Sequence, residues 1–180
     1  PQPHTATLFD ASHVGGETLV FFPSSNPEVV GRFPAERRLV AFSSVSELDR
    51  GAPGAVEKGT LFLSGTVFLA ALDFAVKTGA DPVVLVGADF AVLPDRTHAK
   101  GVRAGELSKP RMGRVRRIRA LDGGEALTNE ILYLYLRDTE NYIERLGGKP
   151  RIVNATARGA LITGAERARL EEVIERLWRT

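Results

Sequence analysis

The sequence contains no cysteine, and this absence excludes several kinds of site. Disulfides, thiol nucleophiles and thiolate metal ligands are all ruled out. Long apolar runs are missing as well, because no stretch approaches the roughly 18 residues of a membrane span. We therefore expect a cytoplasmic protein without a membrane partner.

Short motifs of the commonest nucleotide and hydrolytic enzymes are also missing. The chain carries no P-loop, no GxSxG nucleophile elbow and no dinucleotide-binding GxGxxG. Its three histidines, His4, His13 and His98, are not spaced as a pair of metal ligands. The residues alone thus predict no metal site, and they do not indicate a standard NTPase, hydrolase or dehydrogenase.

Composition is ordinary for a globular protein, with 43% hydrophobic and 26% charged residues in 180 positions. We expect a single α/β domain over residues 1–180. The chain opens with PQPH, without methionine or the apolar core of a signal peptide, so we expect it to be a piece of a longer protein.

Positive charge is concentrated between Lys100 and Arg119, a segment with eight basic residues and a single acidic residue, Glu106. Such a run indicates an anionic partner, and a solvated basic loop is the alternative interpretation. No specific nucleic acid is expected.

Hydrophobic periodicity predicts strands and helices in alternation. Strands are expected at 18–22, 38–42, 82–86 and 151–154, an edge strand or hairpin arm at 113–121, and helices at 65–78, 128–146 and 165–178. Ser64 and Thr128 are the predicted N-caps of the first two helices. Alternation of this kind is typical of an α/β, Rossmann-like three-layer domain with a mainly parallel sheet and helices on both faces.

In such a sheet, ligands bind where the strands end and the following helices begin. Small residues there let a ligand approach the backbone, and N–H groups at helix starts favour phosphate or carboxylate. The polar and small residues predicted at this edge are Ser64, Gly65, Thr66, Gly87, Asp89, Thr128, Asn154 and Thr156. An anionic nucleotide is the expected ligand.

Each of these residues also has a structural interpretation. Ser64 and Thr128 are explained equally well as helix caps, and Asp89 as a turn residue that accepts backbone N–H groups. His98 lies in a polar loop, where it could act as an acid or base near pH 7 or simply be exposed.

Three segments, in this order, carry a resemblance: SGTVFLAALDFAVKTGADPVVLVGADFAVLPDRTHAKG, DGGEALTNEILYLYLRDTENYIE and RIVNATARGALITG. Over about residues 64–164 the chain resembles the domain shared by bacterial motility accessory factors and archaeal 6-hydroxymethylpterin diphosphokinase-like proteins. The matching pattern includes a strand that closes in GxDxA, a His-Ala after a short loop, and NATxxGAxIxG.

The resemblance implies a Rossmann-like, sialyltransferase-like transferase domain. In motility accessory factors the implied reaction is transfer of a nonulosonic acid from a CMP donor to hydroxyls of flagellin. In the archaeal relatives it is Mg²⁺-dependent pyrophosphate transfer from ATP to a pterin alcohol, with the metal held by Asp89 and the nucleotide phosphates.

One departure from the family pattern lies at the amino-terminal side. The family usually begins with a strand that leads into a Gly-Pro-Ser type loop, and nothing before Thr18 supplies it. We therefore expect the domain to be truncated at that side.

Three functions follow as hypotheses. The first is a glycosyltransferase that takes a nucleotide-sugar donor and a protein acceptor, with Asp89 and His98 as catalytic residues. Arg114, Arg116 and Arg117 would then screen the departing phosphate. The second is the pyrophosphokinase, for which Mg²⁺ is the implied cofactor. The third is a non-catalytic or degenerate domain that keeps the fold for nucleotide binding or assembly.

Overall fold

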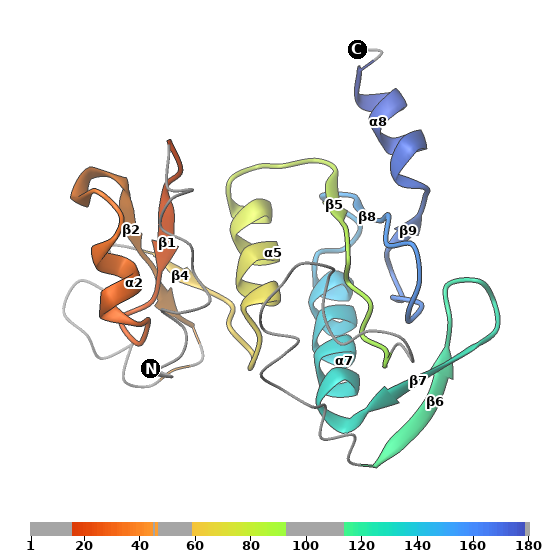
Figure 1. The fold of residues 1–180 in the computed structure, drawn as a ribbon. Helices are drawn as coiled ribbons and strands as arrows, with labels where there is room; N and C mark the ends of the chain where they lie inside the picture. Colours follow the sequence, from red (N-terminus) through yellow and green to blue (C-terminus); the bar gives the residue numbers. More distant parts are fainter. Residues whose placement is uncertain (1–15, 45, 47–58, 93–113, 179–180) are drawn as a thin grey trace. The chain divides into compact units, whose positions relative to one another are not determined.

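The computed structural model describes residues 16–44, 46, 59–92 and 114–178. It has a mixed α/β fold with several small sheets, and most of the paired strands are parallel. The chain divides into two compact units, Pro1–Leu63 and Ser64–Thr180 (Figure 1). An α/β protein is thereby confirmed, whereas a single domain over residues 1–180 stays a prediction. In the described ranges, no helix combines the length and the apolar character that crossing a membrane requires.

The first unit contains a short parallel strand–helix–strand motif. Asn26 caps its helix by accepting a hydrogen bond from the Glu28 N–H, and Pro27 occupies the first helical turn. The strand predicted at 18–22 is confirmed, whereas the one predicted at 38–42 is divided into two short strands, 38–40 and 42–43, that belong to different sheets. The strand 38–40 pairs in parallel with the first strand, with Val20 opposite Leu39. The elements of this unit are β1 (Leu19–Phe21), α2 (Pro27–Gly31), the 3₁₀ turn η2 (Ala35–Arg37), β2 (Arg38–Val40), β3 (Phe42–Ser43) and β4 (Thr60–Leu61).

The second unit is built on a three-stranded parallel sheet and an antiparallel hairpin. Its sheet has the order β5-β8-β9, and β6 and β7 form the hairpin, which leads directly into a long helix (Figure 1). The elements are α5 (Val67–Lys77), β5 (Val83–Leu85), β6 (Val115–Arg119), β7 (Glu125–Asn129), α7 (Glu130–Arg145), β8 (Ile152–Asn154), β9 (Glu166–Arg167) and α8 (Leu170–Trp178).

Helices α5 and α7 begin at other residues than the sequence predicts. Thr66, and not Ser64, caps α5, because its hydroxyl oxygen accepts a hydrogen bond from the Phe68 N–H at 3.2 Å. Asn129, and not Thr128, caps α7 by accepting from the Leu132 N–H at 2.9 Å. Thr128 is still part of strand β7. Both predicted caps are therefore wrong by one or two positions.

The last predicted helix is shorter than expected. Glu166 and Arg167 pair in parallel with Val153 and Asn154, so they extend the sheet as β9 and the helix begins only at Leu170. Its residue Val173 packs against Val153 and Ala155 of the sheet face. Alternate residues of a strand point to opposite faces, so Ile152 and Asn154 face the other side.

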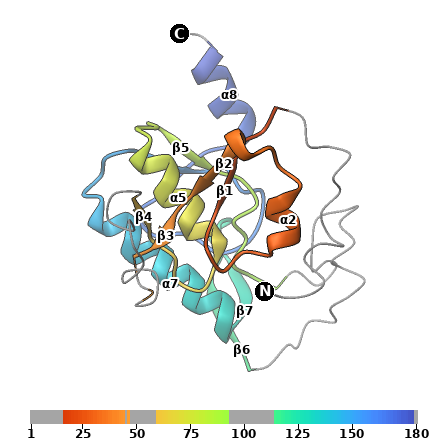
Figure 2. The ribbon, with the colours of Figure 1, turned by 90° about the vertical axis from the view of Figure 1, so that its left-hand side faces the viewer.

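Helices α5 and α7 lie side by side in both views (Figure 1, Figure 2). A buried polar contact joins them: the Tyr142 hydroxyl donates to Asp73 Oδ1 at 2.7 Å. Lys77 Nζ binds the other carboxylate oxygen of Asp73 at 2.8 Å. Burial, followed by the hydrogen bond and the negative charge of Asp73, raises the pKa of Tyr142. The two helices that precede strands β5 and β8 are thus fixed to one another.

Candidate functional site

The loops that follow β5 and β8 lie against each other at the carboxyl edge of the sheet. Ala155 N–H donates to the Leu85 carbonyl at 2.9 Å, which continues the strand pairing beyond the strands. The Ala88 N–H then donates to the hydroxyl oxygen of Thr156 at 3.0 Å in a buried contact. Gly87 and Asp89 are therefore brought to the same edge as Asn154 and Thr156, as the order of elements predicts.

Asp89 is held by its backbone from two sides. Its carbonyl accepts a hydrogen bond from the Ala160 N–H at 2.7 Å. Gly159 packs so closely that an added Cβ would lie 2.4 Å from the Asp89 carbonyl oxygen. At the next residue, the Phe90 carbonyl accepts from the Thr128 hydroxyl at 2.8 Å. The backbone of Asp89 and Phe90 is thus fixed by contacts from distant parts of the unit.

Phe90 has a backbone conformation that is unusual for a residue with a side chain, with φ at 45°. Its ring packs edge-to-face on Phe68, with 5.3 Å between ring centroids. Phe68 belongs to the first turn of α5, so the start of that helix lies beside the Asp89 loop. Strained backbone of this kind persists where surrounding contacts fix it, and it is common next to functional groups.

The Asp89 carboxyl group is half-buried, and this environment changes its acidity. Burial raises the pKa of Asp89, because a partly desolvated carboxylate is less stable than a solvated one. The positive charge of Arg158 offsets part of that shift. A carboxylate with a raised pKa is a better proton acceptor than an exposed one.

Asn154 is 2% exposed and supplies an unused hydrogen-bond donor. Its side-chain oxygen accepts from the Thr156 N–H at 3.0 Å. Its Nδ2 group has no hydrogen-bond partner among the described residues. Buried polar groups are nearly always paired in folded proteins, so this amide indicates a place for a ligand atom or an ordered water.

Three predicted residues at the start of α5 also make contacts with the rest of the unit. The Ser64 hydroxyl donates to Asp138 Oδ2 at 2.5 Å, and the Gly65 carbonyl accepts from the Tyr135 hydroxyl at 2.9 Å. Thr66 caps the helix, as described above. These contacts fix the start of α5 against α7 and give each residue a structural role.

Thr128 is fully buried, and its hydroxyl donates to the Phe90 carbonyl. This hydrogen bond fixes the backbone of the loop that contains Asp89. Its predicted role as a nucleotide contact stays a prediction.

The predicted phosphate-screening arginines lie on the exposed hairpin. The Arg116 guanidinium stacks over the Tyr133 ring, 4.3 Å from its centroid. Arg117 Nη1 contacts Glu125 Oε2 at 2.7 Å. Arg114 is exposed just before β6. His98, the second predicted catalytic residue, lies outside the described residues.

One residue of the site was not predicted. Arg158 belongs to the loop after β8 and influences the charge state of Asp89. The sequence did hold a signal for it, because Arg158 follows Asn154 by four residues in NATAR. Within the described part of the chain, His, Asp and Glu side chains do not gather in a group of three that could hold a metal ion.

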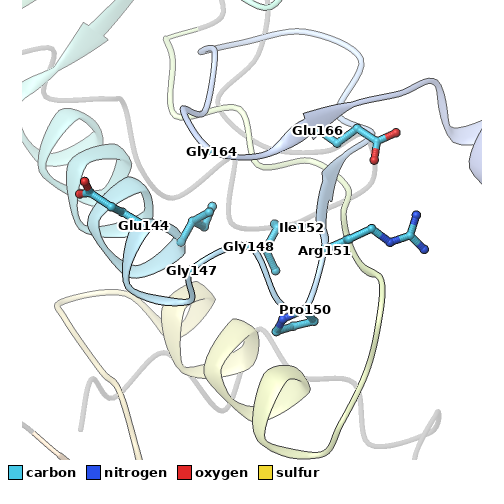
Figure 3. A pocket seen from close by; sticks show the side chains of 9 residues that line it. Glu144, Gly147, Gly148, Pro150, Arg151, Ile152, Gly164 and Glu166 are labelled. Carbon is cyan, nitrogen blue, oxygen red and sulfur yellow. The ribbon is translucent and has the colours of Figure 1, made fainter.

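A hollow lies at the amino end of strand β8, away from the Asp89 edge. It is an open cavity of about 390 Å³ near the end of α7 and the beginning of β8 (Figure 3). Its lining residues are Ile143, Glu144, Gly147, Gly148, Pro150, Arg151, Ile152, Gly164 and Glu166. Strand β8 runs from Ile152 to Asn154, so this cavity and the Asp89 edge are at opposite ends of the strand.

Neither a protein-family model nor a curated protein nor a solved structure matches this chain. The resemblance to motility accessory factors and pterin diphosphokinase-like proteins therefore rests on the sequence motifs alone.

Proposed function

We propose that the chain is a nucleotide-dependent transferase with a Rossmann-like arrangement, whose ligand binds at the carboxyl edge of sheet β5-β8-β9. The observation that carries the proposal is the junction of the two strand-end loops, where the Ala88 N–H binds Thr156 at 3.0 Å. This contact brings Asp89, whose pKa is raised, to the same edge as Asn154, whose Nδ2 group has no hydrogen-bond partner among the described residues. A proton acceptor and a hydrogen-bond donor then serve one bound ligand.

The reaction proposed is that of the motility accessory factors. A hydroxyl oxygen of a protein acceptor, such as flagellin, attacks the anomeric carbon of a nonulosonic acid. The bond from that carbon to the CMP phosphate breaks, and its electron pair leaves with CMP. Asp89 accepts the hydroxyl proton, and a raised pKa favours this role. Asn154, Thr156 and the start of α5 hold the nucleotide.

A second candidate is a non-catalytic domain that keeps this fold for assembly. The observation that favours it is that several of the predicted site residues have a structural role. Thr66 caps a helix, and Thr128 is fully buried beneath the Asp89 loop. Residues with such structural roles are needed by the fold whether or not a ligand binds.

Mapping of ligand contacts by NMR tests the proposal without any substitution. We expect CMP to shift the backbone amide signals of residues 87–89 and 154–156. Signals of residues 147 and 148, at the opposite edge, should stay in place and serve as the internal control. Asp89→Asn should then slow the release of CMP from a CMP-nonulosonic acid donor by at least about 100-fold.

Other ligands distinguish the alternatives. Shifts with ATP only in the presence of Mg²⁺ would replace the glycosyltransferase by the pyrophosphokinase. No shifts with either nucleotide, or shifts confined to residues 147 and 148, would overturn the proposal and favour the non-catalytic domain.

A further inference from the structure

Strand β6 pairs with β7 on one side, and its other side is an outer edge of the hairpin. The Val92 N–H donates to the Leu127 carbonyl at 2.7 Å, so this carbonyl points away from β6. Arg117 lies opposite Leu127 in the hairpin register. In an antiparallel pair, two opposite residues exchange both of their hydrogen bonds or neither. The backbone N–H and carbonyl of Arg117 therefore point away from β7, as do those of Val115, two residues earlier.

A second contact supports this orientation of the hairpin. The Leu161 N–H donates to the Arg119 carbonyl at 2.9 Å from the outer side of β6. Residues 159–161 thus pair with the end of the outer edge. The chain then leaves the edge, because the Thr163 N–H binds Glu140 Oε1 at 2.9 Å. In the described part of the chain, the first half of the β6 edge consequently has no strand beside it.

This open half of the edge is strongly basic. The segment RVRRIR, residues 114–119, contains four arginines and no acidic residue, and each arginine is exposed. Two of them already make contacts within the hairpin and α7. Arg117 Nη1 lies 2.7 Å from Glu125 Oε2, and Arg116 stacks over Tyr133. Exposed contacts of this kind contribute little free energy, so the carboxylates of a partner can share these guanidinium groups.

We propose that the open edge of β6 binds an extended, acidic segment of a partner protein. An unpaired strand edge is a template for strand addition, in which backbone hydrogen bonds supply affinity and alternate side chains supply specificity. Side chains of the added strand would alternate between the two faces of the hairpin. One face carries Arg117 and Arg119 and the other carries Arg116, so acidic residues on either face meet a guanidinium group.

Other occupants fit this edge less well. A second copy of the same edge would bring the arginines of two β6 strands together, and like charges in facing positions are destabilising. A nucleic acid would neutralise the arginines, but it offers no regular row of N–H and carbonyl groups to the strand. The inference goes beyond the proposed function and does not depend on nucleotide binding.

Amide hydrogen exchange measured by NMR tests the edge. In the free chain we expect the amides of Val115 and Arg117 to exchange rapidly, and those of Arg116 and Ile118, which bind β7, to exchange more slowly. A short peptide of alternating glutamate and threonine should slow the exchange of Val115 and Arg117 by at least about fivefold at saturation. The same peptide with N-methyl groups on the residues that face the edge keeps its charge but should give no protection.

A charge-matched pair of variants tests the arginines. Replacing Arg114 and Arg119 together by glutamine should weaken binding of the glutamate–threonine peptide about fivefold in calorimetric titration, because each exposed charge pair contributes modestly. Replacing Arg145 and Lys149 together by glutamine is the matched control, since both are exposed basic residues near the end of α7. The control variant should bind the peptide as the wild type does.

The outcomes separate the alternatives. Slow exchange of Val115 and Arg117 in the free chain would mean that another part of the protein already pairs with the edge, and it would overturn the inference. Absence of protection by the glutamate–threonine peptide, or equal protection by its N-methylated form, would overturn it as well. Protection by a single-stranded oligonucleotide and not by the peptide would replace the protein partner by a nucleic acid. Failure of CMP to shift residues 87–89 would overturn the proposed function and leave this inference intact.

Discussion

At the scale of single residues, the candidate site depends on a close backbone contact between two loops. Gly159 has φ at 122°, a conformation that side chains rarely adopt, and it lies directly on Asp89. The absence of a side chain at residue 159 is what allows the Ala160 N–H to reach the Asp89 carbonyl. The position of the Asp89 backbone therefore depends on a residue 70 positions later in the chain.

Gly159→Ala should destabilise the protein and displace Asp89. The new Cβ would meet the Asp89 carbonyl oxygen at 2.4 Å and its Cα at 2.7 Å, so the two loops must separate. Such overpacking costs about 1–3 kcal/mol beyond the backbone strain. Urea unfolding measures this loss of stability.

Gly148→Ala is the control for that substitution. Gly148 also has a positive φ, 88°, but an added Cβ would meet no atom within 4 Å. This control substitution should lower the free energy of unfolding only by the strain of a left-handed residue, about 1–2 kcal/mol. Equal losses in the two variants would mean that the contact with Asp89 does not constrain the loop.

At the scale of whole elements, sequence and structure agree on most helices and strands and differ at their ends. The hydrophobic pattern located helices α5 and α7, because each has one buried apolar face. It also located strands β5 and β8, because each is a short apolar run. The caps were misplaced because Ser64 and Thr128 bind partners distant in sequence, Asp138 and the Phe90 carbonyl. A local pattern of capping residues cannot reveal such partners.

The buried contact between α5 and α7 gives a prediction at this scale. Tyr142→Phe leaves the Asp73 carboxylate, which is 3% exposed, without one of its hydrogen bonds. We expect a loss of about 1–3 kcal/mol in the free energy of unfolding at pH 7. Tyr135→Phe, which removes a more exposed hydrogen bond to Gly65, should cost less.

Alkaline pH should narrow the difference in the free energy of unfolding between the wild type and Tyr142→Phe. The pKa of Tyr142 is raised in the folded state, so the folded protein keeps the proton that the unfolded chain releases near pH 10. Stability from this group is present below that pH and decreases as the pH rises above it. Unfolding curves at pH 7 and pH 10.5 test this, and a constant difference between the two proteins would contradict it.

At the scale of the whole molecule, the alternation of strands and helices was sufficient to predict an α/β protein. It was not sufficient to predict how the strands divide among sheets. Short strands such as β3 and β9 have only two residues each, and their pairing depends on contacts far apart in sequence. The same limit applies to the site, where Asp89 and Asn154 were predicted by position but Arg158 was not.

The division into two units leads to the last prediction. The buried apolar residues Leu69, Leu136, Ile152 and Ile162 all belong to the unit Ser64–Thr180, as do both loops of the Asp89 edge. A fragment of residues 64–180 should therefore unfold cooperatively in urea and show dispersed amide NMR signals. CMP should shift the signals of its residues 87–89 as it does in the 180-residue chain. A fragment that unfolds without a cooperative transition would mean that residues 1–63 are required for the core of the second unit.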